Sequence, residues 1–223
     1  MIVSDDEQMR TKFHDQLDTL FDQLTTMCQL AGDAVTTATD ALDAADLTHA
    51  EKVFAVTERI GALRGPCEDQ AMALLALQAP VARDLRQVVT GVFLVSDLSR
   101  MGGLAEHIAE SVRRRHPHPV AHGQTQHLLV QMGRLAGELA TAAALVLQTR
   151  DPALALALDV TDNRLDDLHR DLLTVIQEPA WDGSTTEAVD ATLLGRFYER
   201  FGDHCVEVGR RVIFLATGQQ LPQ

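Results

Sequence analysis

Apolar residues along this chain recur three and four positions apart, which is the spacing of one face of an α-helix. The pattern is clearest in the first stretch, from about Asp5 to Ala44, where the apolar series is Phe13, Leu17, Leu20, Leu24, Met27 and Ala31. Capping and helix-breaking residues divide the rest of the chain into five further segments of this kind. The pattern therefore predicts an all-α protein of six helices.

Local signals indicate where the second and third helices begin and end. Thr48 and Glu51 have the spacing of a capping box at the start of the second helix, in which two side chains satisfy free backbone N–H groups. Pro80 is expected in the first turn of the third helix, where the N–H that proline lacks would have no partner. The run RRRHPHP, residues 113–119, then ends the third helix.

Similar signals set the limits of the last three helices. The fourth is expected over about residues 124–149. Asp151 and Pro152 are residue types preferred at the N-cap and the first position of a helix, so they mark the start of the fifth. Ser184 and Glu187 have capping-box spacing and mark the start of the sixth.

An internal repeat relates the third helix to the sixth. Residues 98–112 align without gaps on residues 198–212, and the identical pairs are Arg100 with Arg200, Gly102 with Gly202, and Val112 with Val212. Upstream, residues 56–64 align on residues 161–169. The sequence therefore predicts two tandem three-helix bundles, joined near residues 116–123.

A glycine occupies the same place in both copies. Gly102 and Gly202 lie inside predicted helices, where glycine costs about 1 kcal/mol relative to alanine. A glycine kept in both repeats indicates a close approach of two helices that a Cβ atom would obstruct. In the aligned upstream segments, Ile60 stands opposite Leu165.

Composition narrows the class of protein. The net charge of −13 argues against nucleic acid as a partner, because phosphates would be repelled. The three cysteines form no C-x-x-C pair, so we expect reduced thiols in a cytoplasmic protein. The acidic first ten residues lack the apolar core of a signal peptide. No apolar run reaches the roughly 20 residues of a membrane span, which indicates a soluble protein.

Five carboxylates in the second repeat have a spacing that admits two interpretations. Glu199, Asp203 and Glu207 are four residues apart in the sixth helix, and Asp162 and Asp166 are four apart in the fifth. They form either a solvated face, screened by nearby arginines, or a shared groove. A groove of carboxylate oxygens would suit hard cations such as Mg²⁺, Mn²⁺, Ca²⁺ or ferric iron. The opposite, apolar arc of the sixth helix is expected at Leu193, Phe197, Phe201, Cys205, Val208 and Val212.

Two motifs give the chain a recognisable family likeness. The stretch LGRFYERFGDHCVEVGRRV, residues 194–212, resembles the E-R-x-G-D-H signature of the PhoU family. LLALQAPVARDLRQVV, residues 74–89, resembles a second motif of that family. The resemblance begins at Met9 and covers nearly the whole chain. It implies an extension over residues 1–8, a first three-helix repeat over 9–118 and a second over 119–223.

The resemblance also implies a metal site. Family members bind metal clusters on the bundle surface through paired carboxylates, and the matching residues here are Asp162, Asp166, Glu199 and Asp203, with Glu207 as a possible further ligand. The bound ion would be divalent or trivalent, such as Mg²⁺, Mn²⁺, iron or zinc. The first repeat has no carboxylate at the matching positions, which are Thr57, Gly61, Ser99 and Gly103. One metal centre, in the second repeat, is therefore expected.

The implied function is regulatory and not enzymatic. PhoU proteins restrain the phosphate-starvation response and phosphate uptake when phosphate is plentiful. They are thought to couple the ATPase subunit of a phosphate ABC transporter to a sensor histidine kinase. The resemblance thus implies a cytoplasmic homodimer that reaches the membrane only through its partners.

Three other classes compete with this interpretation. A carboxylate-bridged di-iron or storage bundle needs Glu-x-x-His motifs, and the chain has none; Asp166 with His169 is the nearest approach. A histidine phosphotransfer bundle would need an exposed histidine, for which His169 and His204 are candidates. A plain helical scaffold without a metal ion is the third.

A few other residues carry specific expectations. The arginines of residues 113–115 are expected to complement the negative end of the third helix dipole. His204 is expected to be a hydrogen-bonded structural histidine, and Cys205 a core residue. Arg83 and Arg86 are expected to be solvated, in a segment whose family resemblance makes it a partner surface to test.

Overall fold

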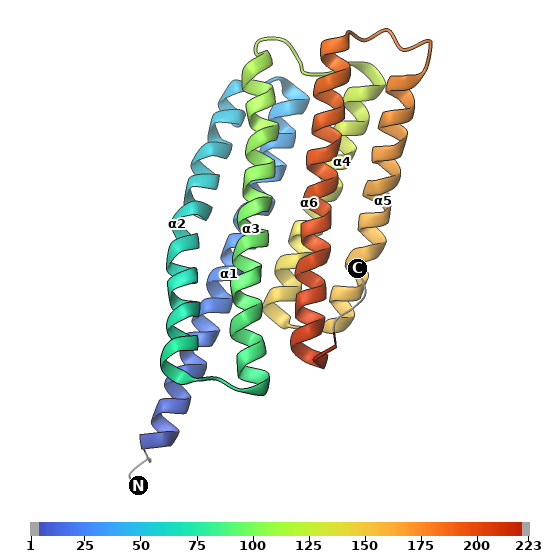
Figure 1. Ribbon diagram of the computed structural model, residues 1–223. Coiled ribbons are helices and arrows are strands. Elements are labelled where there is room, and N and C mark those ends of the chain that lie inside the picture. Colours follow the sequence, from blue (N-terminus) through green and yellow to red (C-terminus); the bar gives the residue numbers. More distant parts are fainter. Residues whose placement is uncertain (1–4, 220–223) are drawn as a thin grey trace.

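The chain folds into six long helices and the all-α prediction is confirmed. The computed structural model describes residues 5–219, and this part of the chain contains no strand. The helices are α1 (Asp5–Ala44), α2 (Leu47–Gln78), α3 (Ala82–Arg115), α4 (Gly123–Thr149), α5 (Pro152–Gln177) and α6 (Thr185–Thr217). The links between them are short, so consecutive helices run in opposite directions (Figure 1).

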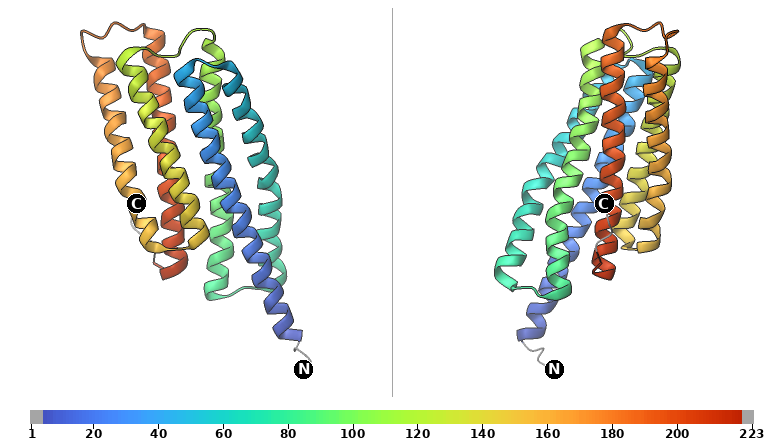
Figure 2. Two further views of the ribbon diagram at one scale, coloured as in Figure 1. Left: turned by 180° about the vertical axis from the view of Figure 1, so that it is seen from behind. Right: turned by 45° about the vertical axis from the view of Figure 1, so that its right-hand side comes forward.

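The six helices form two three-helix groups that lie side by side (Figures 1 and 2). Within the first group α1, α2 and α3 all contact one another. Within the second group α4, α5 and α6 do the same. Contacts of α1 with α4, and of α3 with α6, join the groups. The predicted boundary at residues 118 and 119 falls in the link between α3 and α4. The two groups share one core, so packing alone does not mark where one repeat ends and the next begins. The extents of the two repeats therefore stay a prediction.

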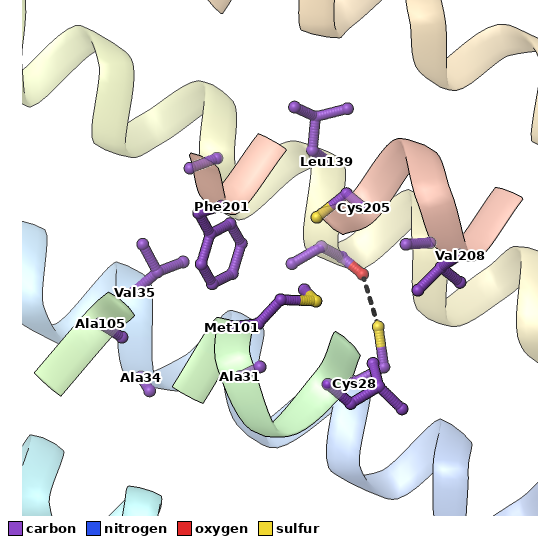
Figure 3. Packing of buried hydrophobic residues seen from close by; sticks show 14 of the residues in the cluster. Cys28, Ala31, Ala34, Val35, Met101, Ala105, Leu139, Phe201, Cys205 and Val208 are labelled. Atoms are coloured by element: carbon purple, nitrogen blue, oxygen red, sulfur yellow. Dashed lines mark hydrogen bonds between the residues drawn. The ribbon is translucent and has the colours of Figure 1, made fainter. Parts of the chain in front are cut away.

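The shared core lies where α1, α3, α4 and α6 meet. Figure 3 shows Val35, Met101, Leu139 and Phe201 converging there, one from each of these helices. Many of the surrounding core residues are alanines, which let helix backbones approach closely. The free Cys205 is fully buried in this cluster, so its predicted place in the core is confirmed.

The predicted extension is only partly described. Residues 1–4 lie outside the described residues, whereas residues 5–8 are continuous with α1. The start of α1 protrudes beyond the other helices at one end of the molecule (Figure 1).

Two predicted helix starts are wrong. Asp46, and not Thr48, is the N-cap of α2, because its Oδ1 accepts hydrogen bonds from the N–H groups of Thr48 (2.7 Å) and His49 (3.3 Å). Pro80 lies outside α3, which begins at Ala82. The residue after Pro80 is extended and serves as the N-cap, so the proline belongs to the turn.

The predicted starts of α5 and α6 are confirmed. Asp151 caps α5 by accepting from the N–H of Ala153 at 2.8 Å, and proline opens the helix. Ser184 caps α6 through its Oγ, which accepts from the N–H of Glu187 at 3.1 Å. The carboxylate of Glu187 does not complete the capping box. It accepts instead from the N–H of His122 at 2.8 Å, which ties α6 to the link before α4.

In the first half of α6, the buried face lies one position further along the chain than the expected arc. Leu193 is 46% exposed and Phe197 is only partly buried. The buried stripe instead follows alternating steps of four and three residues, through Leu194, Tyr198, Phe201, Cys205, Val208 and Val212. This is the spacing of a helix that packs along its whole length against antiparallel neighbours.

By length and composition, α3 is the one described helix that could cross a membrane. Its most apolar stretch of 18 residues has a mean hydropathy of 1.3, and 56% of that stretch is buried inside the fold. The apolar character of α3 is therefore accounted for by its place in the core between α1, α2 and α6.

Candidate metal centre

The candidate site lies along the contact between α5 and α6. Leucines of α5 pack onto glycines of α6 at every seventh position, and the pairs are Leu158 with Gly209, Leu165 with Gly202, and Leu172 with Gly195. A Cβ atom added at Gly202 would lie 2.6 Å from Leu165 Cδ2 and 2.6 Å from Asp162 Oδ1. The glycine therefore lets α5 approach until Asp162 rests against the α6 backbone.

The first repeat uses the same contact. A Cβ atom added at Gly102 would lie 2.9 Å from Ile60 Cδ1. Because Ile60 aligns with Leu165, the two repeats share this close approach, and the prediction made from the paired glycines is confirmed.

Asp162 is the most perturbed carboxylate of the site. Burial, followed by the negative charges of Asp166, Asp203, Asp159 and Glu199, raises the pKa of its carboxyl group to about 7. Such an effect requires that the charges lie near one another. The fold therefore brings the two predicted pairs, one from α5 and one from α6, to a common face.

Two further carboxyl groups are affected in the same direction. Burial and then the charge of Asp203 raise the pKa of Asp166. Burial and then Asp203 also raise the pKa of Glu199, although the guanidinium of Arg196 opposes the shift and donates a hydrogen bond to Glu199 Oε1. The anionic state of the whole group is thus unfavourable without added positive charge.

Two carboxylate oxygens at this face are buried and have no hydrogen-bond donor. They are Asp162 Oδ1 and Glu199 Oε2. A buried acceptor without a partner costs free energy, of order 1–3 kcal/mol for a neutral group and more for a charged one. A proton or a cation would supply the missing interaction, so the residues present fit a hard metal ion that prefers oxygen ligands.

The carboxylates do not form a compact ligand shell as they stand. Within residues 5–219, no three or more His, Cys, Asp or Glu side chains are grouped closely enough to hold a metal ion. Like charges favour rotamers that separate them, and the pairing of Glu199 with Arg196 is one such arrangement. Metal binding here would require side-chain rotation, with the helix backbones already in place.

Glu207 is not brought to this group. Its carboxylate pairs with Arg211 Nη2 at 3.0 Å and lies 3.9 Å from Arg210 Nη1. Arg211 also donates from Nε to Asp97 Oδ2 at 2.7 Å, and Asp97 Oδ1 lies 3.2 Å from His204 Nδ1. Glu207 thus belongs to an ion-pair group between α3 and α6. The expected structural role of His204 is confirmed.

The four matching positions of the first repeat carry no carboxylate. The hydroxyl groups of Thr57 and Ser99 donate to backbone carbonyls of their own helices, at 3.1 Å and 2.7 Å. A Cβ atom added at Gly61 or Gly103 would meet nothing within 4 Å. At the matching positions, the second repeat therefore has carboxylates and the first has hydroxyl groups and glycines.

The sequence pattern did not predict an ion pair in which the carboxylate is buried. Asp190 of α6 is buried, with 5% of its side chain exposed, and it pairs with Arg114 (3.0 Å) and Arg115 (2.5 Å) of α3. These two arginines lie with Arg113 in the last turn of α3, as expected for residues that complement its dipole, and the pairing with Asp190 is an additional interaction. The available signal was the position of Asp190, four residues before Leu194 and hence on the buried stripe of α6.

Two three-helix units that share a core, with a carboxylate face between the last two helices, define a duplicated helical-bundle protein. Comparison with protein families makes this specific. The family model described as the PhoU domain matches residues 24–112 and again residues 129–212. The chain belongs to the PhoU family.

Similar proteins cover nearly the whole chain. "Phosphate-specific transport system accessory protein PhoU homolog 2" of Mycobacterium tuberculosis is 49% identical over 210 residues, which make up 94% of this chain and 99% of that protein. The PhoU homolog 1 of Mycobacterium leprae is 48% identical and covers 94% and 95%, respectively.

Solved structures share the fold. The phosphate transport system regulatory protein PhoU from Streptococcus pneumoniae superposes with a TM-score of 0.84 at 24% identity, covering 95% of this chain and 100% of that one. PhoU from Pseudomonas aeruginosa gives a TM-score of 0.82 at 22% identity, covering 93% and 100%.

Proposed function

We propose that this protein is a regulatory accessory protein of phosphate uptake that has no catalytic activity of its own. The observation that carries the proposal is the full-length match to relatives named as accessory proteins of a phosphate-specific transport system, at 49% identity. The paired PhoU domains span both halves of the chain. An accessory protein acts by contact, and a long helical bundle offers extended surfaces for that purpose.

The proposed partners are the ATPase subunit of a phosphate ABC transporter and a sensor histidine kinase. By contacting both, the protein would keep the phosphate-starvation response repressed while phosphate is plentiful. It would act in the cytoplasm as a homodimer and reach the membrane through these partners. The names of the relatives support contact with the transport system, and the kinase and the dimer are inferred from the family's regulatory role.

We further propose that Asp162, Asp166, Glu199 and Asp203 hold a divalent or trivalent metal ion. The support is the pair of buried oxygens without donors and the raised pKa values around them. When bound, the ion would supply the positive charge that the carboxylates lack. Glu207 would have to leave Arg211 in order to join the site.

The surroundings of the two candidate histidines do not suit the alternative classes that require a histidine. His204 has 12% of its side chain exposed and is hydrogen-bonded to Asp97, so it does not suit phosphotransfer. Burial lowers the pKa of His169, which is also partly covered. Neither histidine belongs to a group that could hold a metal ion within the described residues.

Gene deletion tests the regulatory proposal. We expect phosphate-responsive genes to remain expressed in phosphate-rich medium when the gene is deleted, and repression to return when the intact gene is restored. The measurement is transcript abundance in rich and poor medium. Normal repression in a strain that also lacks any paralogue would contradict the proposal.

A further inference from the structure

The turn between α2 and α3 exposes more large apolar surface than its surroundings explain. Leu77 is 79% exposed and Val81 is 74% exposed, the two highest values for large apolar side chains among the described residues. Leu85 follows one helical turn later and is also exposed. Together with Arg83 and Arg86, these residues are called the α2–α3 tip. The tip lies at one end of the molecule, away from the face between α5 and α6 (Figure 1).

The tip is held in a defined shape. Ala79 closes α2 in the left-handed region, with φ 42° and ψ 52°, and Ala82 also has a positive φ of 48°. Alanine adopts this region only at a cost in free energy, so the surrounding structure imposes the turn. Pro80 between them limits backbone freedom further. A rigid apolar projection loses little entropy when it is covered.

The segment that forms the tip carries more positive than negative charge, unlike the chain as a whole. From residue 70 to residue 96 the charged residues are Arg83, Asp84 and Arg86, in a chain whose net charge is −13. Neither arginine makes an ion pair within the described residues, whereas many other arginines do. The Nε of Arg86 is buried and has no hydrogen-bond partner.

We propose that the α2–α3 tip is a docking surface for a partner protein that offers an apolar recess rimmed by carboxylates. Apolar anchors next to arginines are the combination that carries most of the energy in protein interfaces. The carboxylates would complement the exposed Arg83, and the recess would cover Leu77, Val81 and Leu85. The inference rests on the proposed function, since a regulator that acts by contact needs such a surface.

Two other occupants fit the tip less well. An anionic membrane would attract two arginines but repel the strongly acidic remainder of the molecule. A second copy of the chain, joined tip to tip by a two-fold axis, would place the arginines of both copies close together. A separate apolar protein surface, with carboxylates only at the rim that faces the tip, need not meet the acidic remainder of the molecule and avoids both conflicts.

The test measures binding of the full chain to two membrane proteins from the same organism. The intact phosphate transporter complex and the full-length sensor kinase are each placed in nanodiscs, and binding is followed by biolayer interferometry. The variants are Leu77→Ser with Val81→Ser, and separately Arg83→Glu. The matched controls are Leu156→Ser with Val160→Ser, an exposed apolar pair on α5, and Arg164→Glu.

We expect both tip variants to weaken binding to at least one partner by about tenfold or more, the range of interface hot spots. The controls should stay within about twofold of the parent. All of these side chains are exposed, so helicity and melting temperature should not change. Unchanged binding of the tip variants to a partner that the parent binds would overturn the inference and leave the proposed function standing.

Three further outcomes also decide against the inference. Binding to empty nanodiscs that the tip variants lose would assign the surface to lipid. Self-association that only the tip variants lose, measured by light scattering, would assign it to a second copy. If the parent binds neither membrane protein, the proposed function fails and the docking surface fails with it.

Discussion

Asp162 is the residue on which the chemistry of the candidate site depends. Its carboxylate lies against Gly202, has one buried oxygen without a donor, and is surrounded by four other carboxylates. The close approach of α5 and α6 contributes to this environment, because it brings Asp162 against the α6 backbone. A charged Asp162 is therefore unfavourable in the folded metal-free protein.

The raised pKa of Asp162 predicts a pH dependence of stability. Its pKa is 3.8 in a model peptide and about 7 in the folded chain. The folded state thus binds the proton more tightly, so this contribution to stability is present below about pH 4 and is lost as the pH rises to about 7. With a chelator present, the melting temperature of the parent should fall between about pH 4 and pH 7. Asp162→Asn should reduce the fall, and parallel profiles for the two proteins would contradict the prediction.

Metal binding should depend on the carboxylates of α6. Replacing Glu199 and Asp203 by alanine removes two of the four proposed ligands, so Mn²⁺ binding measured by titration calorimetry should be abolished. Without metal, the same variant loses repulsion between carboxylates and should melt at a temperature equal to or above that of the parent. Ser99→Ala, at the matching place in the first repeat, should bind Mn²⁺ like the parent. Equal binding by the double variant would leave a solvated, arginine-screened face as the correct interpretation.

At the scale of the elements, glycines set how closely pairs of helices approach. On α4, a Cβ atom added at Gly133 would lie 2.2 Å from Thr39 Oγ1 and 2.9 Å from Thr39 Cβ of α1. Thr39 cannot move easily, because its hydroxyl bonds to Val35 O at 2.7 Å and lies 3.1 Å from the buried hydroxyl of Tyr198. The contact between α1 and α4, which joins the two repeats, therefore depends on this glycine.

Two glycine substitutions should have opposite effects on stability. Gly133→Ala should lower the free energy of unfolding by about 1–3 kcal/mol, the usual cost of overpacking. Gly103→Ala should raise it by up to about 1 kcal/mol, because alanine favours the helix and the added methyl group meets nothing within 4 Å. Urea denaturation of both variants checks the prediction. A stabilised Gly133→Ala protein would show that α1 and α4 have room to separate.

At the scale of the whole molecule, the two repeats share a core. Contacts of α1 with α4 and of α3 with α6 join them, and the buried carboxylates of Asp97 and Asp190 pair with Arg211 and Arg115 across the contact between α3 and α6. Separating the repeats would expose these charges and the apolar residues around Phe201 (Figure 3). The repeats are therefore duplicated in sequence but dependent on each other in stability.

The shared core predicts a single unfolding transition for the full chain. Trp181 is the only tryptophan and lies in the link between α5 and α6. Its Nε1 donates to Oγ1 of Thr125 on α4 at 3.2 Å. Its fluorescence reports on the second repeat, whereas circular dichroism reports on all six helices. We expect the two signals to change at the same urea concentration. A chain of residues 119–223 alone should be much less stable, and separate transitions in the full chain would show independent bundles.

Local signals in the sequence were sufficient for much of the fold. Asp151, Pro152 and Ser184 mark the starts of α5 and α6 correctly, because a capping side chain acts within a single turn. The paired Gly102 and Gly202 also indicated a close helix contact in each repeat. Where several residues could serve as the cap, as at Asp46 and Thr48, only the backbone geometry decided between them.

The sequence by itself determined the six helices, the duplicated plan and the presence of carboxylates at the four matched positions of the second repeat and not of the first, since each can be read from the order and spacing of residues along the chain. The tertiary structure decided which charges meet. It placed Asp190 with Arg114 and Arg115, and Glu207 with Arg211 and not with Asp162. The partners of Asp190 are about 75 residues away along the chain, so their meeting depends on how α3 packs against α6. Burial follows from the same packing, and burial is what raises the pKa of Asp162 and turns a spacing of carboxylates into a candidate metal site.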